Sequence, residues 1–413
     1  MISGLLSSHP WTTPIIPGQW LKPSLAGKQR EGLTMTKSAI IGLNEIGQSV
    51  WLDNLSRSLI NSGELKRLID EDGLRGITSN PTIFQKAISA SSDYDLSLQR
   101  MLDQGIRDEK ELFFGLAFED ISTAADLLWP VYQSTNGLDG FVSIEVSPNL
   151  AYDTDATISE AKRLFKTIGK KNIFVKVPGT KQGLPAIEQL ISEGVNVNVT
   201  LLFSVNRYEE AAEAYLRGLE RRVRFGQPIH EIASVASFFV SRVDTLTDKL
   251  LESRLFLATS KAERKKIESL FGKAAVANAK ISYKKYKDIF TGKRFLNLRP
   301  KGGQVQRILW GSTGTKDPRY SDIKYVSELI APDSINTMPE KTMMAFKDHG
   351  QARITITNHL EEVERLFEDL KSVGIDINNV TKQLETEGVD LFSDSFFSLL
   401  KEIAKKRESF LSR

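Results

Sequence analysis

The chain has 413 residues, and its 55 basic side chains nearly balance 52 acidic ones, for a net charge of +3. This near balance argues against a dedicated nucleic-acid binder, and no apolar run approaches the ~18 residues of a membrane span. The complete absence of cysteine excludes disulfides, thiolate metal sites and a thiol nucleophile.

The first 30 residues differ in composition from the rest of the chain. They contain four prolines and no Asp or Glu, and they lack the apolar core of a secretory signal. Two interpretations stand: a targeting or disordered tail, or translation that begins at Met35, which we favour. Residues 1–36 are therefore left out of the predicted fold.

Beyond residue 48, short apolar runs alternate with helical stretches. The runs are typical of buried parallel strands, and they occupy residues 49–53, 76–81, 141–146, 172–180, 196–203, 233–240, 307–313 and 334–339. Apolar spacing predicts helices at 59–71, 84–130 with a break near Gly105, 155–168, 184–192, 207–224, two within 243–288, 321–330, and amphipathic helices after 350.

Eight strand–helix units predict a parallel α/β sheet that closes into a (β/α)8 TIM barrel with additional helices. The alternative is an open doubly wound sheet, but no Gly-x-Gly-x-x-Gly follows the first strand and no Walker loop occurs. We expect a tail at 1–36, a catalytic barrel at 37–350, and C-terminal helices at 351–413 that pack on the barrel.

Lys176 lies in the middle of the apolar run at 172–180. An ordinary lysine has a pKa of about 10.4, so holding the amine neutral near pH 7 costs about 4.6 kcal/mol. Burial can meet that cost and yields a nucleophilic amine that attacks ketones. The alternatives are a lysine that extends to solvent at a strand end, or one paired with a buried carboxylate.

Polar residues interrupt the strands before and after Lys176 as well. Because each buried polar group needs partners, six successive strands that carry them would be costly as structure alone. In a closed barrel all of them face one mouth, and they are Asp53, Thr78, Asn80, Glu145, Asn198, Thr200 and Ser237.

These residue types suit Schiff-base chemistry on a ketose. The iminium formed by Lys176 withdraws electrons from a neighbouring carbon–carbon bond, and Asp53 or Glu145 takes the proton of the adjacent hydroxyl. Two alternatives stay open: Asp53 as the N-cap of the following helix, and Glu145 as a structural charge partner of Lys176. The four histidines are too scattered to predict a metal site, which leaves only a carboxylate-bound magnesium ion open.

Taken together, the ordered motifs resemble those of the transaldolase family, in its larger bacterial branch. The motifs are Trp51-Leu52-Asp53-Asn54, Gly76-Ile77-Thr78-Ser79-Asn80-Pro81, Ser143-Ile144-Glu145, Phe174-Val175-Lys176-Val177-Pro178-Gly179-Thr180, Asn198-Val199-Thr200-Leu201-Leu202-Phe203-Ser204, Ala236-Ser237-Phe238-Phe239-Val240-Ser241-Arg242 and Asn336-Thr337-Met338-Pro339-Glu340.

The resemblance implies a role for each matching position. Lys176 would be the Schiff-base lysine, Asp53 the base for the C4 hydroxyl, and Glu145 with Thr200 the holders of a catalytic water. Substrate binding would fall to Thr78, Asn80, Asn198, Ser237 and Arg242, the last two at the sugar phosphate. The loop at 311–316 departs from the family pattern, because Lys316 stands where an arginine is expected; phosphate binding and a solvated loop lysine are both open for it.

The implied function is transfer of a dihydroxyacetone unit from sedoheptulose 7-phosphate to glyceraldehyde 3-phosphate in the pentose phosphate pathway. The implied setting is cytoplasmic, with no cofactor, no metal, no nucleic acid and no membrane, and with assembly into a homo-oligomer left open. A fructose-6-phosphate aldolase is the alternative, but such relatives resemble shorter barrels with Gln in place of Glu145 and Tyr in place of Phe239. A third hypothesis is an inert barrel that only binds sugar phosphates.

Overall fold

The eight apolar runs form eight parallel strands that close on themselves in the computed structural model, which describes residues 38–412. The strands are β1 (Gln48–Leu52), β2 (Gly76–Ile77), β3 (Phe141–Glu145), β4 (Ile173–Pro178), β5 (Val197–Leu202), β6 (Ser234–Phe239), β7 (Arg307–Gly311) and β8 (Ser334–Met338). β1 pairs with β8, with Gln48 opposite Ser334, so the predicted (β/α)8 barrel is confirmed.

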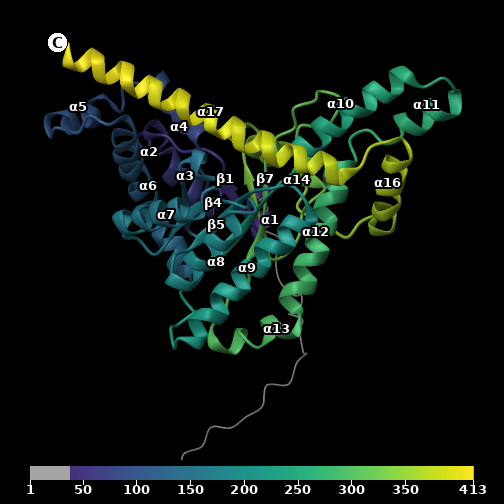
Figure 1. Ribbon diagram of the computed structural model, residues 1–413, viewed down its shortest axis with the longest axis horizontal. Helices are drawn as coiled ribbons and strands as arrows, with labels where there is room; N and C mark the ends of the chain where they lie inside the picture. Colours follow the sequence, from purple (N-terminus) through teal and green to yellow (C-terminus); the bar gives the residue numbers. More distant parts are fainter. Residues whose placement is uncertain (1–37, 413) are drawn as a thin grey trace, which may run out of the picture. The chain divides into compact units, whose positions relative to one another are not determined.

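Helices surround this barrel (Figure 1). They are α1 (Ala39–Ile46), α2 (Arg57–Asn61), α3 (Glu64–Asp70), α4 (Pro81–Ala90), α5 (Asp95–Asp103), α6 (Glu109–Ser134), α7 (Thr154–Ile168), α8 (Gly183–Glu193), α9 (Val205–Arg224), α10 (Ser241–Leu257), α11 (Lys261–Glu268), α12 (Ala274–Thr291), α13 (Lys293–Leu296), α14 (Lys324–Ser327), α15 (Glu340–His349), α16 (Leu360–Ser372) and α17 (Ile377–Leu411), with short 3₁₀ turns η1 (Pro148–Leu150) and η2 (Arg299–Lys301).

The interior of the barrel follows from the two-residue alternation of strand side chains. The layers of the interior nearer the amino ends of the strands are filled by a small apolar cluster of Trp51, Phe141, Phe174, Ala233, Val235, Leu309 and Ile335. A Cβ on Gly76 would lie 2.5 Å from the Trp51 ring, so only glycine lets the indole occupy the interior beside β2. The next inward position along β1 is Asp53, and along β4 it is Lys176, which places the polar groups above this plug.

A buried ion pair closes the opposite, amino-terminal end of the strands. Arg307 lies 2.7 Å from Asp139, and both side chains are buried. Ser49 and the indole nitrogen of Trp51 donate further hydrogen bonds to the same carboxylate, at 2.7 and 3.2 Å. Since these donors come from β1 and β7, the network ties together strands on either side of the β1–β8 closure.

Several helices differ from the sequence-based expectations. The helix predicted at 59–71 is two helices, α2 and α3, because Gly63 adopts a left-handed φ of 79° between them. Three helices occupy the region predicted to hold two, because the Ser260 side chain accepts a hydrogen bond from the Glu263 backbone and starts α11. The predicted strand at 76–81 ends after two residues, since the Asn80 side chain caps α4 and Pro81 begins it.

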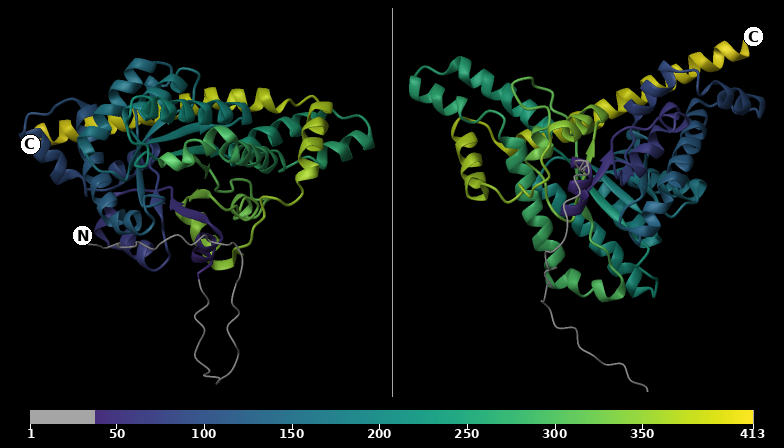
Figure 2. Two further views of the ribbon diagram at one scale, coloured as in Figure 1. Left: turned by 90° about the horizontal axis from the view of Figure 1, so that it is seen from below. Right: turned by 180° about the vertical axis from the view of Figure 1, so that it is seen from behind.

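The last helix, α17, crosses the end of the barrel at which the strands terminate (Figures 1 and 2). It packs against α4, α6, α10 and β5. Where it passes β5, a Cβ on Gly388 would lie 3.1 Å from Leu201, so the helix backbone lies close to the strand. The described residues 38–412 belong to one compact unit, and the predicted tail at 1–36 lies outside the described residues.

Candidate active site

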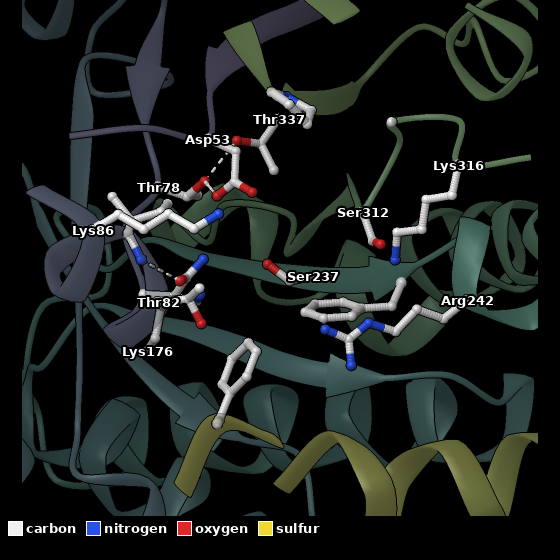
Figure 3. Close-up of a pocket in the computed structure, with 17 residues that line it drawn as sticks. Asp53, Thr78, Thr82, Lys86, Lys176, Ser237, Arg242, Ser312, Lys316 and Thr337 are labelled. Carbon is white, nitrogen blue, oxygen red and sulfur yellow. Dashed lines mark hydrogen bonds between the residues drawn. The ribbon is translucent and has the colours of Figure 1, made fainter. Parts of the chain in front are cut away.

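The polar strand-end residues surround a cavity of about 390 Å³ at the carboxyl end of the barrel strands. Figure 3 shows its two sides: Asp53 and Thr78 lie on one, Arg242 and Lys316 on the other, and Ser237 lies between them. Of the predicted site residues, those that line the cavity are Asp53, Thr78, Asn80, Lys176, Ser237, Arg242 and Lys316.

Lys176 is 4% exposed, so it does not extend to solvent as one alternative required. Its amine donates to the backbone oxygen of Ser79 at 3.2 Å and lies 3.3 Å from Glu145 Oε2. Strand register explains the pairing, because Glu145 stands opposite Lys176 in β3 and β4, and Lys176 stands opposite Asn198 in β5. Three predicted residues thus occupy one level of the barrel.

Both carboxyls near the amine, the half-buried Asp53 and the buried Glu145, have raised pKa values. Burial is the main cause for Asp53, while the charge of Lys176 and the hydrogen bond from Thr78 act in the opposite direction. Burial likewise raises the pKa of Glu145, with Lys176 again opposing and the charge of Asp53 adding to the rise. A carboxylate with a raised pKa accepts a proton more readily, which suits both groups to general acid–base work.

Asp53 is held by two threonines. Thr78 Oγ1 donates to Asp53 at 2.7 Å and lies 2.7 Å from Thr337 Oγ1. Because Thr78 has one hydroxyl proton and gives it to Asp53, Thr337 donates in turn to Thr78. The alternative of Asp53 as an N-cap is wrong, since Ser56 caps α2 instead.

Asn198 lies in a hydrogen-bonded row with two serines rather than on the cavity wall. Ser237 Oγ donates to Asn198 Oδ1 at 2.6 Å, and Asn198 Nδ2 donates to Ser143 Oγ at 3.1 Å. Asn198 therefore orients Ser237. Asn80 accepts a hydrogen bond from the Ile83 backbone at 3.0 Å, so its amide nitrogen is the group left for a ligand.

Thr200 is fully buried in β5, one strand from Lys176. Within residues 38–412, neither its hydroxyl nor Glu145 Oε1 has a hydrogen-bond partner. Buried polar atoms ordinarily find partners, and a polar pocket of this kind can hold a water molecule.

Two cations form the far side of the cavity. Burial lowers the pKa of Arg242, with the charge of Glu387 on α17 acting against that change. Although the Lys316 side chain is solvent-exposed, crowding by neighbouring protein atoms and the charge of Arg242 lower its pKa. Together with Ser237 and Ser312, these cations offer charge and donors to an anionic group such as a phosphate.

Several cavity residues are not among the predicted site residues, although the loop at 311–316 and the motif at 336–340 contain three of them. They include Lys86 on α4, Ser312 and Gly314 after β7, Thr337 on β8 and Phe392 on α17. Lys86 reads as an ordinary surface lysine and Phe392 as a core position of an amphipathic helix. Among residues 38–412, no group of three or more His, Asp or Glu side chains is placed to hold a metal ion.

Comparison with known proteins agrees with this geometry. A family model described as Transaldolase/Fructose-6-phosphate aldolase matches residues 50–403. This chain is a member of that family.

Proteins named transaldolase match this chain over nearly their whole length. The transaldolase of Trichodesmium erythraeum is 46% identical over 377 residues, which cover 90% of this chain and 98% of that protein. Transaldolase 2 of a Nostoc strain is 46% identical over 375 residues, and the transaldolase of Saccharopolyspora erythraea 45% over 372, each covering 90% and 98% of the two chains. The description of the family names a sugar phosphate, fructose 6-phosphate. No helix within residues 38–412 is long and apolar enough to cross a membrane.

Proposed function

We propose that this protein is a transaldolase, a transferase that works through a Schiff base on Lys176. It takes a dihydroxyacetone unit from sedoheptulose 7-phosphate and passes it to glyceraldehyde 3-phosphate, giving erythrose 4-phosphate and fructose 6-phosphate. One observation carries the proposal: the buried amine of Lys176 lies 3.3 Å from the buried carboxylate of Glu145, at a cavity lined by Asp53 and by the two cations Arg242 and Lys316.

Glu145 starts the reaction by taking a proton from the amine of Lys176. The free amine attacks the C2 ketone of the donor and gives a carbinolamine. The carbinolamine then loses water, and protons are transferred through Glu145 and the catalytic water that it holds with Thr200. The resulting iminium carries positive charge next to the bond between C3 and C4. Asp53 removes the proton of the C4 hydroxyl, the bond breaks, and the aldose product leaves an enamine on Lys176.

Arg242, Lys316 and Ser237 hold the phosphate of the donor and later that of the acceptor. An arginine fork and a lysine charge suit phosphate oxygens, and neither is needed for the chemistry at the amine. We assign Asn80 to the hydroxyls of the three-carbon unit, and Thr78 and Asn198 to orienting Asp53 and Ser237. We also propose that residues 37–350 form the catalytic domain in the cytoplasm, with 351–413 as helices that cover it.

Release of free dihydroxyacetone, the aldolase alternative, is disfavoured by Phe239. Its ring lines the cavity, and a phenyl ring has no hydroxyl that could give a proton to the enamine. An inert barrel is disfavoured because a buried acid and a buried amine, Glu145 and Lys176, would be retained at a cost without chemistry to perform.

Borohydride trapping tests the proposal. Incubation with fructose 6-phosphate and borohydride is expected to fix a three-carbon adduct on Lys176, located by peptide mass spectrometry. Lys176→Ala is expected to lose the adduct and more than ~10³-fold in activity, with an unchanged circular dichroism spectrum. An adduct on another lysine, or turnover retained by Lys176→Ala, would reject the mechanism.

A further inference from the structure

One wall of the cavity comes from α17, far from any strand motif. Phe392 lines the cavity and is 6% exposed. Its ring centroid lies 5.9 Å from the Lys176 amine and 6.4 Å from the ring centroid of Phe239. Phe239 in turn contacts Phe203 edge to face at 5.2 Å. The amine therefore has an aromatic side in addition to its carboxylate side.

The segment that carries Phe392 is fixed to the barrel on both sides of the ring. Thr82, itself a cavity residue, donates to Ser395 Oγ at 2.8 Å. Arg207 on α9 lies 3.1 Å from Glu385, and Lys406 lies 2.8 Å from Asp95 on α5. These contacts join α17 to α4, α9 and α5 on either side of Phe392 and so hold the ring at the cavity.

The fate of the enamine on Lys176 decides between transfer and release. In transfer, the enamine carbon bonds to the aldehyde carbon of the acceptor, and the aldehyde oxygen takes a proton. In release, the same carbon takes a proton instead. Either iminium then adds water, the carbon–nitrogen bond breaks, and the product ketose or free dihydroxyacetone leaves the regenerated amine. Only release needs a proton on the enamine carbon before the acceptor arrives.

We propose that Phe392 is a specificity-determining residue that keeps water away from the enamine carbon, so that the three-carbon unit stays bound to Lys176 until an aldose acceptor arrives. The inference rests on the proposed transaldolase function. A phenyl ring donates no proton and offers a water molecule no hydrogen bond from its own atoms. Water needed for hydrolysis is held instead where Glu145 and Thr200 have unpartnered buried oxygens.

Truncation of the ring tests this role. Phe392→Ala opens a space next to Lys176 that water can enter, and the ratio of free dihydroxyacetone to transfer product is expected to rise about tenfold, less than a positioned acid would give. Both products are quantified in one reaction at fixed acceptor concentration. Phe392→Leu, which keeps the space apolar, is expected to retain a ratio near that of the parent protein.

Phe396 supplies the matched control, one turn further along α17. It is 3% exposed and packs 5.8 Å from the Phe113 ring, but it does not line the cavity. Phe396→Ala removes the same ring from the same helix and is expected to leave the product ratio unchanged. An equal rise in both variants would show general loosening of α17 and overturn the role of Phe392.

The outcomes separate the inference from the function on which it rests. If the parent protein forms no Lys176 adduct, the proposed function fails. If the adduct and transfer are present but Phe392→Ala leaves the ratio unchanged, only the role of Phe392 fails. Should Phe392→Ala not fold, Phe392→Gln keeps most of the volume, brings a hydrated amide to the same place, and is expected to raise the ratio as well.

Discussion

At the scale of single residues, the contact between Lys176 and Glu145 has a structural effect and, in the proposed mechanism, a chemical role. A buried amine and a buried carboxylate are each costly alone, and each offsets the cost of the other. The pair also provides a route for the proton that must leave the amine before attack. The alternative of a structural charge pair thus describes a resting state of the proposed mechanism rather than a rival to it.

Asp53→Asn tests the base for the C4 hydroxyl. The variant is expected to lose about 10²–10⁴-fold in kcat, because it cannot accept the proton, while borohydride still traps an adduct with the donor. In the parent protein, kcat/KM is expected to fall with decreasing pH because Asp53 becomes protonated. Since the pKa of Asp53 is raised, this fall should occur at pH values above 3.8, its ordinary pKa. An Asp53→Asn variant with full turnover would exclude Asp53 as the base.

The same shift has a consequence for stability. A carboxyl whose folded-state pKa is raised binds its proton more tightly when folded, so its charged form lowers stability at pH values above the raised pKa. Asp53→Asn is therefore expected to unfold at a higher temperature than the parent protein at neutral pH. The difference should disappear below pH 3.8, where Asp53 is protonated in both states. Thermal melts across pH measure it.

Lys316 gives the phosphate site a pH dependence of its own. Its pKa is lowered from 10.5, so its charge is lost with rising pH earlier than that of an ordinary lysine. The KM for a phosphorylated donor is expected to increase at alkaline pH, and Lys316→Arg should move that increase to higher pH because arginine stays charged. Identical KM profiles for the two proteins would indicate a solvated loop lysine.

How far the site could be predicted depended on where each residue sits in the sequence. Asp53, Lys176 and Ser237 stand out because each breaks an apolar strand, and parallel strands in a barrel bring such residues to one end. Phe392 could not be found this way, because a phenylalanine on an amphipathic helix reads as ordinary core. Asn198 stands out in the same way, but its hydrogen bonds to Ser143 and Ser237 depend on cross-strand distances that sequence spacing does not reveal.

At the scale of secondary structure, strands were easier to predict than helix ends. Apolar runs bounded by turn residues marked all eight strands, whereas helix breaks depend on single residues. Gly63 divides α2 from α3, and the Ser260 cap starts α11, but neither interrupts the apolar spacing strongly. The shortness of β2 likewise comes from the Asn80 cap and Pro81, which are local signals inside an apparent strand.

The packing of β1 against β2 yields a prediction for Gly76. A Cβ at this position would lie 2.5 Å from the Trp51 ring, which other interior side chains hold in place. Gly76→Ala is expected to lower the free energy of unfolding by about 1–3 kcal/mol through overpacking. Urea denaturation measures the change. A variant as stable as the parent would mean that the indole can move aside.

At the scale of the whole molecule, the two ends of the barrel perform separate tasks. The candidate active site lies at the carboxyl ends of the strands, and the buried Arg307–Asp139 pair lies at the amino ends. The apolar plug that includes Trp51 and Phe174 lies between them. Changes at one end should therefore leave the other largely intact.

Asp139→Ala tests this separation. Removal of the carboxylate leaves the Arg307 charge buried without its partner, and the expected loss of stability is about 3–5 kcal/mol. The KM for donor and acceptor should stay unchanged below the melting temperature. The double variant Asp139→Leu/Arg307→Met, which removes both charges, is expected to recover most of the loss. A large change in KM would show that the two ends are coupled.

The passage of α17 across the mouth of the barrel matters for damaged or unfinished copies of the protein. A copy cut anywhere between β8 and Phe392 keeps all eight strands, the reactive amine and both cations, because these precede residue 340. A chain that ends before Phe392 keeps Phe203 and Phe239 but lacks the Phe392 ring, so under the proposed role of Phe392 it is expected to cleave the donor and release dihydroxyacetone. Loss of this C-terminal segment is therefore expected to favour aldol cleavage of the donor over transfer to an acceptor.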